Sequence, residues 1–130
     1  MSQENVEIAR RCYEALNRGD FDAAFEDFAP DFKLDMSRAI GLDRGVYSLN
    51  QVRRLFESLV DTLEIVRLEA DYIDAGEHVV MPFTNRMRGR DGIEVQARGT
   101  WPCTIRDGLI VRITIYQERQ EALEAAGLRE

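Results

Sequence analysis

The sequence has few of the residues that usually signal a metal site, a redox centre, a membrane span or a nucleic-acid partner. Its two cysteines, Cys12 and Cys103, lack C-x-x-C spacing, and His78 is its single histidine. No metal, cofactor or reactive thiol pair is therefore expected. No apolar run approaches the ~20 residues of a membrane span, and the start "MSQENVEIAR" lacks the basic and apolar regions of a signal peptide.

Positive charge is also scarce, with 17 Lys and Arg against 24 Asp and Glu and a formal net charge of -7. This balance disfavours nucleic acid and anionic membranes as partners, because both require a basic surface. We expect a cytoplasmic protein whose thiols stay reduced. The 130 residues contain no repeat, linker or low-complexity tract, so residues 1–130 are interpreted as a single domain.

Helical periodicity predicts three helices in the first half of the chain. They cover residues 3–17, a segment that begins at the capping residue Asp20 and ends before Pro30, and residues 50–63 with Ser48 or Asn50 as the N-cap. Each has apolar residues spaced three or four positions apart along one face. The faces are Val6, Ala9, Tyr13 and Leu16; Phe21, Ala24, Phe25 and Phe28; and Val52, Phe56, Leu59 and Leu63.

Alternating patterns predict strands elsewhere. The segment "DFKLDMSR" (31–38) is expected to form one strand, and from Glu64 onward four long strands are separated by "DAGE", "GRDG" and "RDG", which are typical of hairpin turns. A last short helix, "RQEALEAAGL", ends at Gly127. This order predicts an α+β domain in which three helices cover one face of a curved antiparallel sheet and enclose a conical cavity.

Strand alternation predicts which side chains face this cavity. The inner set has one polar member in its longest stripe, Asn85, which needs a partner or a ligand. The outer set is more polar, although Ile110, Thr114 and Tyr116 suit a moderately polar dimer interface. The inner set comprises Phe32, Leu34 and Met36; Val79, Met81, Phe83, Asn85 and Met87; Val95, Ala97, Gly99, Trp101, Cys103 and Ile105; and Val111, Ile113, Ile115 and Gln117.

Four segments, "YEALNRGDFDAAFEDFAPDF", "DRGVYSLNQVRRLFESL", "CTIRDGLIVRITIY" and "EALEAAGL", resemble the nuclear transport factor 2-like (NTF2-like) superfamily, closest to its SnoaL-like branch, which includes ketosteroid isomerase-like proteins. The resemblance implies a cystatin-like cone and a homodimer formed through the outer sheet face. The superfamily contains isomerases, hydrolases, cyclases, dehydratases and proteins without catalysis, so the resemblance implies a fold more than a reaction.

The ketosteroid isomerase pattern places a tyrosine, a catalytic aspartate and a protonated aspartic acid in the cone. The resemblance aligns Cys12, Met36 and Trp101 with these three positions, and Tyr13 and Asp35 are adjacent to the first two. A shift of one residue reverses the face of a strand and rotates a helical side chain by roughly 100°. The isomerase roles are thus displaced or vacant, and alternation itself places Asp35 on the outer face.

We therefore select candidates by chemistry. Asp35 is the candidate general base and Tyr13 the candidate hydrogen-bond donor at a catalytic site. Arg38 and Tyr47, in the loop after the first strand, could hold a polar or anionic group of a ligand. The candidate ligand-binding residues are Asn85, Trp101, Phe83, Met36, Phe56, Ile113, Gln117, Arg38 and Tyr47.

Three functions fit these residues. The first is cofactor-free acid/base catalysis, of the isomerase, hydratase or cyclase type, on a small and largely apolar organic molecule. The second is binding of such a molecule without turnover. The third is a dimerisation module whose cone is filled by its own side chains.

Overall fold

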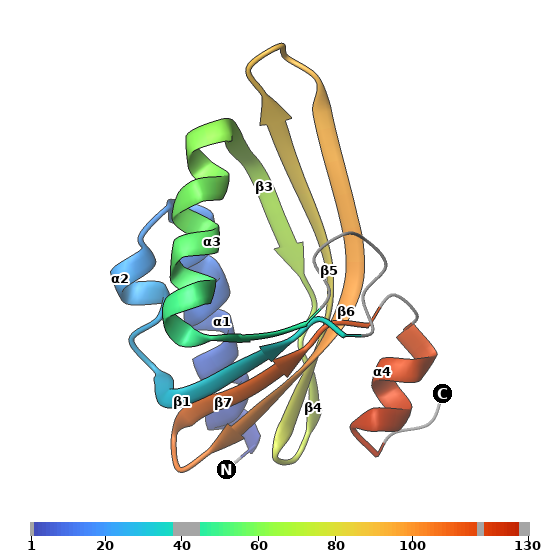
Figure 1. Ribbon diagram of the computed structural model, residues 1–130. Coiled ribbons are helices and arrows are strands. Elements are labelled where there is room, and N and C mark those ends of the chain that lie inside the picture. Colours follow the sequence, from blue (N-terminus) through green and yellow to red (C-terminus); the bar gives the residue numbers. More distant parts are fainter. Residues whose placement is uncertain (1, 38–44, 117–118, 128–130) are drawn as a thin grey trace.

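The computed structural model describes residues 2–37, 45–116 and 119–127, and it confirms the predicted α+β cone with a curved sheet (Figure 1). Helices α1, α2 and α3 lie on one side of the sheet and α4 lies on the other. The helices are α1 (Ser2–Arg18), α2 (Phe21–Ala24), α3 (Leu49–Thr62) and α4 (Arg119–Ala125). The strands are β1 (Phe28–Asp35), β2 (Val46–Ser48), β3 (Leu63–Ala70), β4 (Ile73–Ala75), β5 (His78–Gly89), β6 (Glu94–Arg106) and β7 (Leu109–Thr114).

The sheet has the strand order β2-β1-β7-β6-β5-β3, with β4 paired to β5. The predicted meander is confirmed, because β3, β5, β6 and β7 pair with one another as antiparallel neighbours. Strand β1 pairs with β7 in parallel, so the first strand lies beside the last one. No helix in the described part of the chain is long and apolar enough to cross a membrane.

The N-terminal caps of α3 and α2 show how local sequence determines where these helices begin. Ser48 caps α3 in a capping box with Gln51, which satisfies two backbone amides at the helix start. Helix α2 contains only four residues, capped by Asp20, and the strand predicted to begin at 31 begins at Phe28. The prediction that this helix runs to Pro30 was wrong because Pro30 lies inside β1, where a fixed φ is also compatible with extended backbone.

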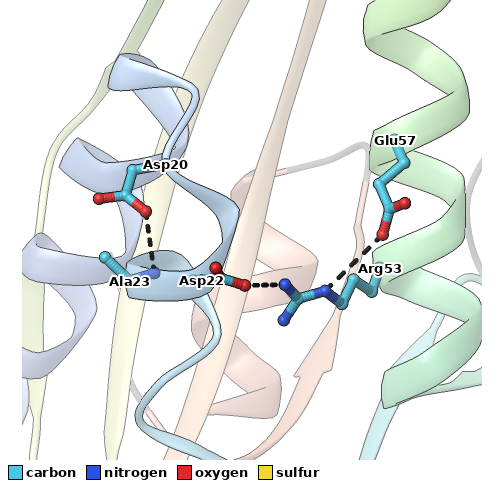
Figure 2. Close-up of polar contacts among 5 residues, drawn as sticks. All are labelled: Asp20, Asp22, Ala23, Arg53 and Glu57. Atoms are coloured by element: carbon cyan, nitrogen blue, oxygen red, sulfur yellow. Dashed lines mark hydrogen bonds and ion pairs between the residues drawn. The ribbon is translucent and has the colours of Figure 1, made fainter.

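Arg53 connects α3 to α2 at the helical side of the cone (Figure 2). Its guanidinium contacts the carboxylate of Asp22 on α2 and lies 3.7 Å from that of Glu57, one turn along α3. The Asp20 side chain accepts a hydrogen bond of 3.2 Å from the amide of Ala23. These pairs are solvent-exposed and contribute about 0–1 kcal/mol each. Their consequence is positional, since they hold the short α2 against α3.

Helix α4 buries part of the sheet face that carries the more polar outer set. Ala122 and Leu123 of α4 are buried, as are Val80 of β5 and Pro102 and Thr100 of β6, which belong to the outer set. At this end of the sheet the outer face is therefore covered by α4 of the same chain. The apolar face of a seven-residue helix was enough to cover it.

A bulge changes the facing of β7. Thr104 pairs with Arg112 but Ile105 pairs with Ile110, so Val111 is the extra residue of the ladder. Ile110 is consequently buried in the main core with Ile113, although alternation predicted it on the outer face, and Val111 is only partly buried. The bulge reverses the facing of every residue that precedes it in the strand.

The far end of the β5–β6 hairpin extends beyond the helices (Figure 1). Both faces of β6 are exposed from Glu94 to Arg98. Val95 is 47% exposed and Ile93 is 64% exposed. The predicted inward-facing roles of Val95 and Ala97 were therefore wrong, because the alternation of their side chains continues past the point where the helices cover the sheet.

Candidate functional site

An apolar cavity of about 130 Å³ lies inside the cone, between the helices and the sheet. Four of the sequence-predicted ligand-binding residues line it: Met36, Phe56, Trp101 and Ile113. Its remaining walls come from α1, α3, the segment after α2, and strands β1 and β7. These other lining residues are Cys12, Leu16, Phe25, Phe28, Phe32, Leu34, Val52, Leu55 and Ile115.

Aromatic rings extend from this cavity toward the β5 side of the sheet. Trp101 packs edge-on against Tyr13 with 5.7 Å between ring centroids, and it packs against Phe83 at 4.5 Å. The Tyr13 hydroxyl donates a hydrogen bond to the Asn85 side-chain oxygen. The structure thus brings together Tyr13, Phe83, Asn85 and Trp101, four candidates from elements far apart in the sequence.

The Trp101 indole N–H is buried and has no hydrogen-bond acceptor among the residues that the structure describes. A buried donor without a partner costs about 1–3 kcal/mol relative to a paired one. Trp101 also forms part of the cavity wall, but the surface of that wall is apolar, so the indole N–H is not exposed to the cavity.

The Tyr13–Asn85 pair gives a testable stability effect. Replacing Tyr13→Phe removes the hydroxyl and leaves the partly buried Asn85 amide without its donor, so we expect the free energy of unfolding to fall by about 1–2 kcal/mol. Urea denaturation of Tyr13→Phe, Asn85→Leu and the double variant measures the pair. If the loss of stability in the double variant equals the sum of the losses in the two single variants, the two side chains are not coupled and the prediction is contradicted.

The ionisable groups near the cavity are held in their neutral forms. Burial raises the pKa of the Cys12 thiol from 9.0 to about 12, with a smaller contribution from the Asp27 carboxylate. Burial also raises the pKa of Tyr13 above its ordinary value, and the nearby Tyr72 and Cys12 add to the increase. These groups can donate hydrogen bonds at neutral pH, but neither is a base there.

Asp35 lies on the outer face, where alternation predicted it. Its carboxylate accepts hydrogen bonds from Arg112 at 2.6 Å and from the Ser37 hydroxyl at 2.6 Å, and its side chain is 16% exposed. Burial alone would raise the pKa of this carboxyl, but the hydrogen bonds from Ser37 and the pairing with Arg112 outweigh burial and lower it. The structure does not bring Asp35 to the cavity, and a lowered pKa makes the carboxylate a weaker base.

Tyr47 lies outside the cavity, in an open groove of about 580 Å³ along α3. Met36, Leu55 and Phe56 line both the groove and the cavity, so these side chains separate the two spaces. The other groove residues are Gln51, Arg54, Ser58 and Leu59. The candidates Arg38 and Gln117 lie outside the described residues.

The cavity residues that the sequence did not assign to the cavity are Phe25, Phe28 and four residues of α1 and α3, Cys12, Leu16, Val52 and Leu55, whereas Phe32, Leu34 and Ile115 belong to the set predicted to face it. A signal was present, because Cys12 and Leu16 are spaced i, i+4 on one helix. The candidates were chosen mainly for polar or aromatic chemistry on the strands, whereas these helix positions are apolar. Among the described residues, no group of three or more His, Cys, Asp and Glu side chains could hold a metal ion. The single histidine, His78, contacts Thr104 instead, with 2.9 Å between Nδ1 and Oγ1.

A curved sheet covered by three helices around an apolar hollow defines a class of cone-shaped α+β proteins, whose members are described as cystatin-like or ketosteroid isomerase-like folds. The model of the SnoaL-like domain family matches residues 9–113, so the chain belongs to the SnoaL-like domain family. The predicted superfamily is thereby confirmed. No curated protein sequence matches the chain.

Solved structures show the same fold at low sequence identity. One from Xanthomonas campestris pv. campestris, provisionally described as a polyketide cyclase, has a TM-score of 0.72 and 21% identity, covering 96% of this chain and 98% of that one. A Catenulispora acidiphila protein in complex with trimethylamine has a TM-score of 0.71 and 16% identity over 94% and 93% of the two chains. TerC co-crystallised with polyporic acid has a TM-score of 0.70 and 16% identity over 95% and 98%.

Proposed function

We propose that the protein binds a small, largely apolar organic molecule in the cavity of its cone. The observation that carries this proposal is the apolar cavity of about 130 Å³, whose lining residues carry no charged side chain. Most protein cores are packed without voids of this size. An empty apolar cavity of ~150 Å³ in another protein stays dry and takes up benzene, so a ligand of about one ring suits this space.

The walls indicate the chemistry of that ligand. Phenylalanine rings from the α2–β1 segment and the Trp101 indole form flat apolar surfaces, which favour an aromatic or cyclic molecule. The cavity surface itself is apolar, which favours a ligand without charged or strongly polar groups inside the cavity. Two structures of this fold with 16% identity contain small organic molecules, trimethylamine and polyporic acid, and they support binding as a use of the fold.

The groove on α3 is the proposed entry route. Met36, Leu55 and Phe56 line both the groove and the cavity, and all three side chains are partly or largely exposed. Methionine is unbranched and adopts many rotamers, so it can move aside at low energetic cost. A larger ligand would extend through this wall into the groove, where Arg54 and Tyr47 offer polar contacts.

Binding without turnover is favoured over acid/base catalysis by the state of the titratable groups. Asp35 is held on the outer face by Arg112, and the Cys12 thiol beside the cavity stays protonated near neutral pH. Proton abstraction requires a base within hydrogen-bond reach of the substrate. We therefore assign Tyr13 and Asn85 to packing beside the cavity, where Tyr13 contacts the wall residue Trp101, rather than to a proton relay.

The test compares the same substitution at two positions of α3. Val52→Phe places a ring inside the cavity, whereas Val60→Phe places it at an exposed position of the same helix. We expect the wild type and Val60→Phe to bind indole and toluene, measured by ligand-observed NMR and calorimetry. We expect Val52→Phe to weaken this binding at least about tenfold, because the ring occupies the volume that the ligand needs.

Two outcomes would reject the proposal: a wild-type protein that binds neither probe, or a Val52→Phe variant that binds both as well as Val60→Phe does. The homodimer and the cytoplasmic location expected from the sequence remain predictions beside this one.

A further inference from the structure

We propose that the groove on α3 holds the carboxylate of an amphipathic ligand whose ring lies in the cavity, and that Arg54 binds this carboxylate. The ligand class is a ring-bearing carboxylic acid with a short connecting chain, such as an arylalkanoic acid. This assignment rests on the proposed function, because it adds a second part to the same site. Three observations support it: the residues shared by groove and cavity, the charge of their walls, and the side of α3 that Arg54 occupies.

Helix α3 supplies one side of the groove through residues that recur every three or four positions and therefore lie on one side of the helix. These residues are Gln51, Arg54, Leu55, Ser58 and Leu59. Met36, Tyr47 and Phe56 complete the lining. The described groove is thus mainly apolar and, apart from the Tyr47 hydroxyl, its polar side chains come from α3.

The groove and the cavity meet at Met36, Leu55 and Phe56, which line both spaces. Leu55 is 41% exposed, and the other two side chains are partly buried. The cavity of about 130 Å³ is apolar and has room for about one ring, so the charged end of a longer ligand must lie outside it. The adjacent space is the groove of about 580 Å³, where Arg54 directly precedes the shared residue Leu55.

The charge of the walls selects an anion. Among the described residues that line the two spaces, Arg54 is the one charged side chain, and it is exposed. A guanidinium presents a planar fork of N–H donors that fits a carboxylate through two parallel hydrogen bonds. No described lining residue carries a carboxylate, so an amine would find no counter-ion there. A carboxylate is therefore favoured over a cationic group.

The neighbouring Arg53 shows why Arg54 is available. Arg53 contacts Asp22 and Glu57, and its side chain is directed toward α2 (Figure 2). Successive residues of a helix differ in direction by about 100°, so Arg54 reaches the groove instead. With 24 Asp and Glu in the chain, carboxylate partners for arginine are plentiful. Arg54 nevertheless forms no ion pair with another residue in the ranges 2–37, 45–116 and 119–127.

Three probes that share a phenyl ring test the assignment: toluene, 4-phenylbutyramide and 4-phenylbutyrate, of which only the last is charged. Calorimetry and ligand-observed NMR measure their dissociation constants. We expect the wild type to bind the carboxylate about three- to tenfold more tightly than the amide, because a charge-assisted pair at an exposed site contributes modestly. This preference should decrease as the salt concentration rises, since salt screens exposed charges.

Three variants locate the two ends of the ligand. Arg54→Gln should abolish the preference for the carboxylate over the amide. Arg67→Gln is the matched control, because it removes the same charge from an exposed position of β3, outside groove and cavity, and should keep the preference. Val52→Phe should weaken the binding of 4-phenylbutyrate at least about tenfold, since its ring needs the cavity. Circular dichroism checks that each variant is folded.

The outcomes separate this inference from the cavity proposal. A wild type that binds toluene, but binds the carboxylate no more tightly than the amide, would overturn the inference and leave the cavity proposal intact. A preference that persists in Arg54→Gln, or 4-phenylbutyrate binding that is unchanged in Val52→Phe, would also overturn it. A wild type that binds none of the probes would reject both proposals.

Discussion

Raising the pH from about 8 to about 11 is expected to lower the free energy of unfolding by several kcal/mol, because buried thiols and phenols ionise far more easily in the unfolded chain. Burial raises the pKa of Cys12 from 9.0 to about 12 and also raises the pKa of Cys103. Burial raises the pKa of Tyr72 from 10.0 to about 12 and raises that of Tyr13 as well.

The sign follows from the proton balance. Below about pH 9 both the folded and the unfolded states keep these protons, so the stabilisation is fully present. Above this pH the unfolded state releases protons that the folded state retains, and stability is lost progressively until the folded pKa near 12 is reached. Each of the two buried thiols contributes on the order of 2 kcal/mol to the loss at about pH 11.

Urea denaturation at successive pH values, followed by far-UV circular dichroism, gives the slope of stability against pH. Cys12→Ala and Cys103→Ala each remove one thiol, so each slope above about pH 9 should be shallower than that of the wild type. The loss of packing in each alanine variant lowers the free energy of unfolding by the same amount at every pH, so it does not affect the slope. A profile that stays flat to pH 11 in the wild type, or equal slopes in all three proteins, would contradict the assignment.

Local sequence was sufficient to predict the elements that depend on short-range chemistry. The "RDG" turn precedes β7, the Ser48 capping box begins α3, and the helical spacing of Tyr13 and Leu16 gives the buried face of α1. In each case the residues that determine the structure are neighbours in the chain, or they repeat with the period of the element. The order of these elements predicted the cone, and the resemblance of four segments indicated the family.

The errors concern long-range geometry. One extra residue at Val111 reverses the facing of Ile110, and nothing in the alternation of β7 shows where the ladder of β6 is interrupted. The exposure of Val95 depends on how far α3 extends over the sheet, and the burial of Thr100 depends on where α4 returns. These distances are set by packing between elements, which a pattern within one strand does not record.

The candidate site divides in the same way. Met36, Phe56, Trp101 and Ile113 line the cavity because inward-facing apolar residues in the covered part of a cone meet at its axis. Asp35 does not, since its neighbour Leu34 occupies the inner face. The pairing of Tyr13 with Asn85 joins residues 72 positions apart, and no feature of either segment identifies the other as its partner.

Gly99→Val is expected to destabilise the protein by about 3 kcal/mol, because Phe83 occupies the space that a side chain would need. A Cβ atom at Gly99 would lie 2.7 and 2.9 Å from two carbons of the Phe83 ring and 3.1 Å from the Tyr116 carbonyl oxygen. The ring cannot move freely, since Phe83 packs against Trp101 and is largely buried. Glycine is therefore required here by close packing across the β5–β6 pair.

The displacement would reach the cavity. Phe83 contacts Trp101, and Trp101 forms part of the cavity wall and contacts Tyr13. Gly99→Val should consequently weaken the binding of indole as well as lower stability. Ala97→Val is the matched control, because it adds a branched side chain on the same strand and face at an exposed position, where β-propensity favours valine.

A double-mutant cycle with Phe83→Ala distinguishes steric displacement from a general loss of strand structure. If the ring is the obstacle, removing it makes room for valine, and the double variant should be more stable than the sum of the single losses predicts. Urea denaturation measures the four free energies of unfolding. Additive losses, or a Gly99→Val variant as stable as Ala97→Val, would show that Phe83 yields to a side chain at 99 and that the cavity wall is softer than its packing indicates.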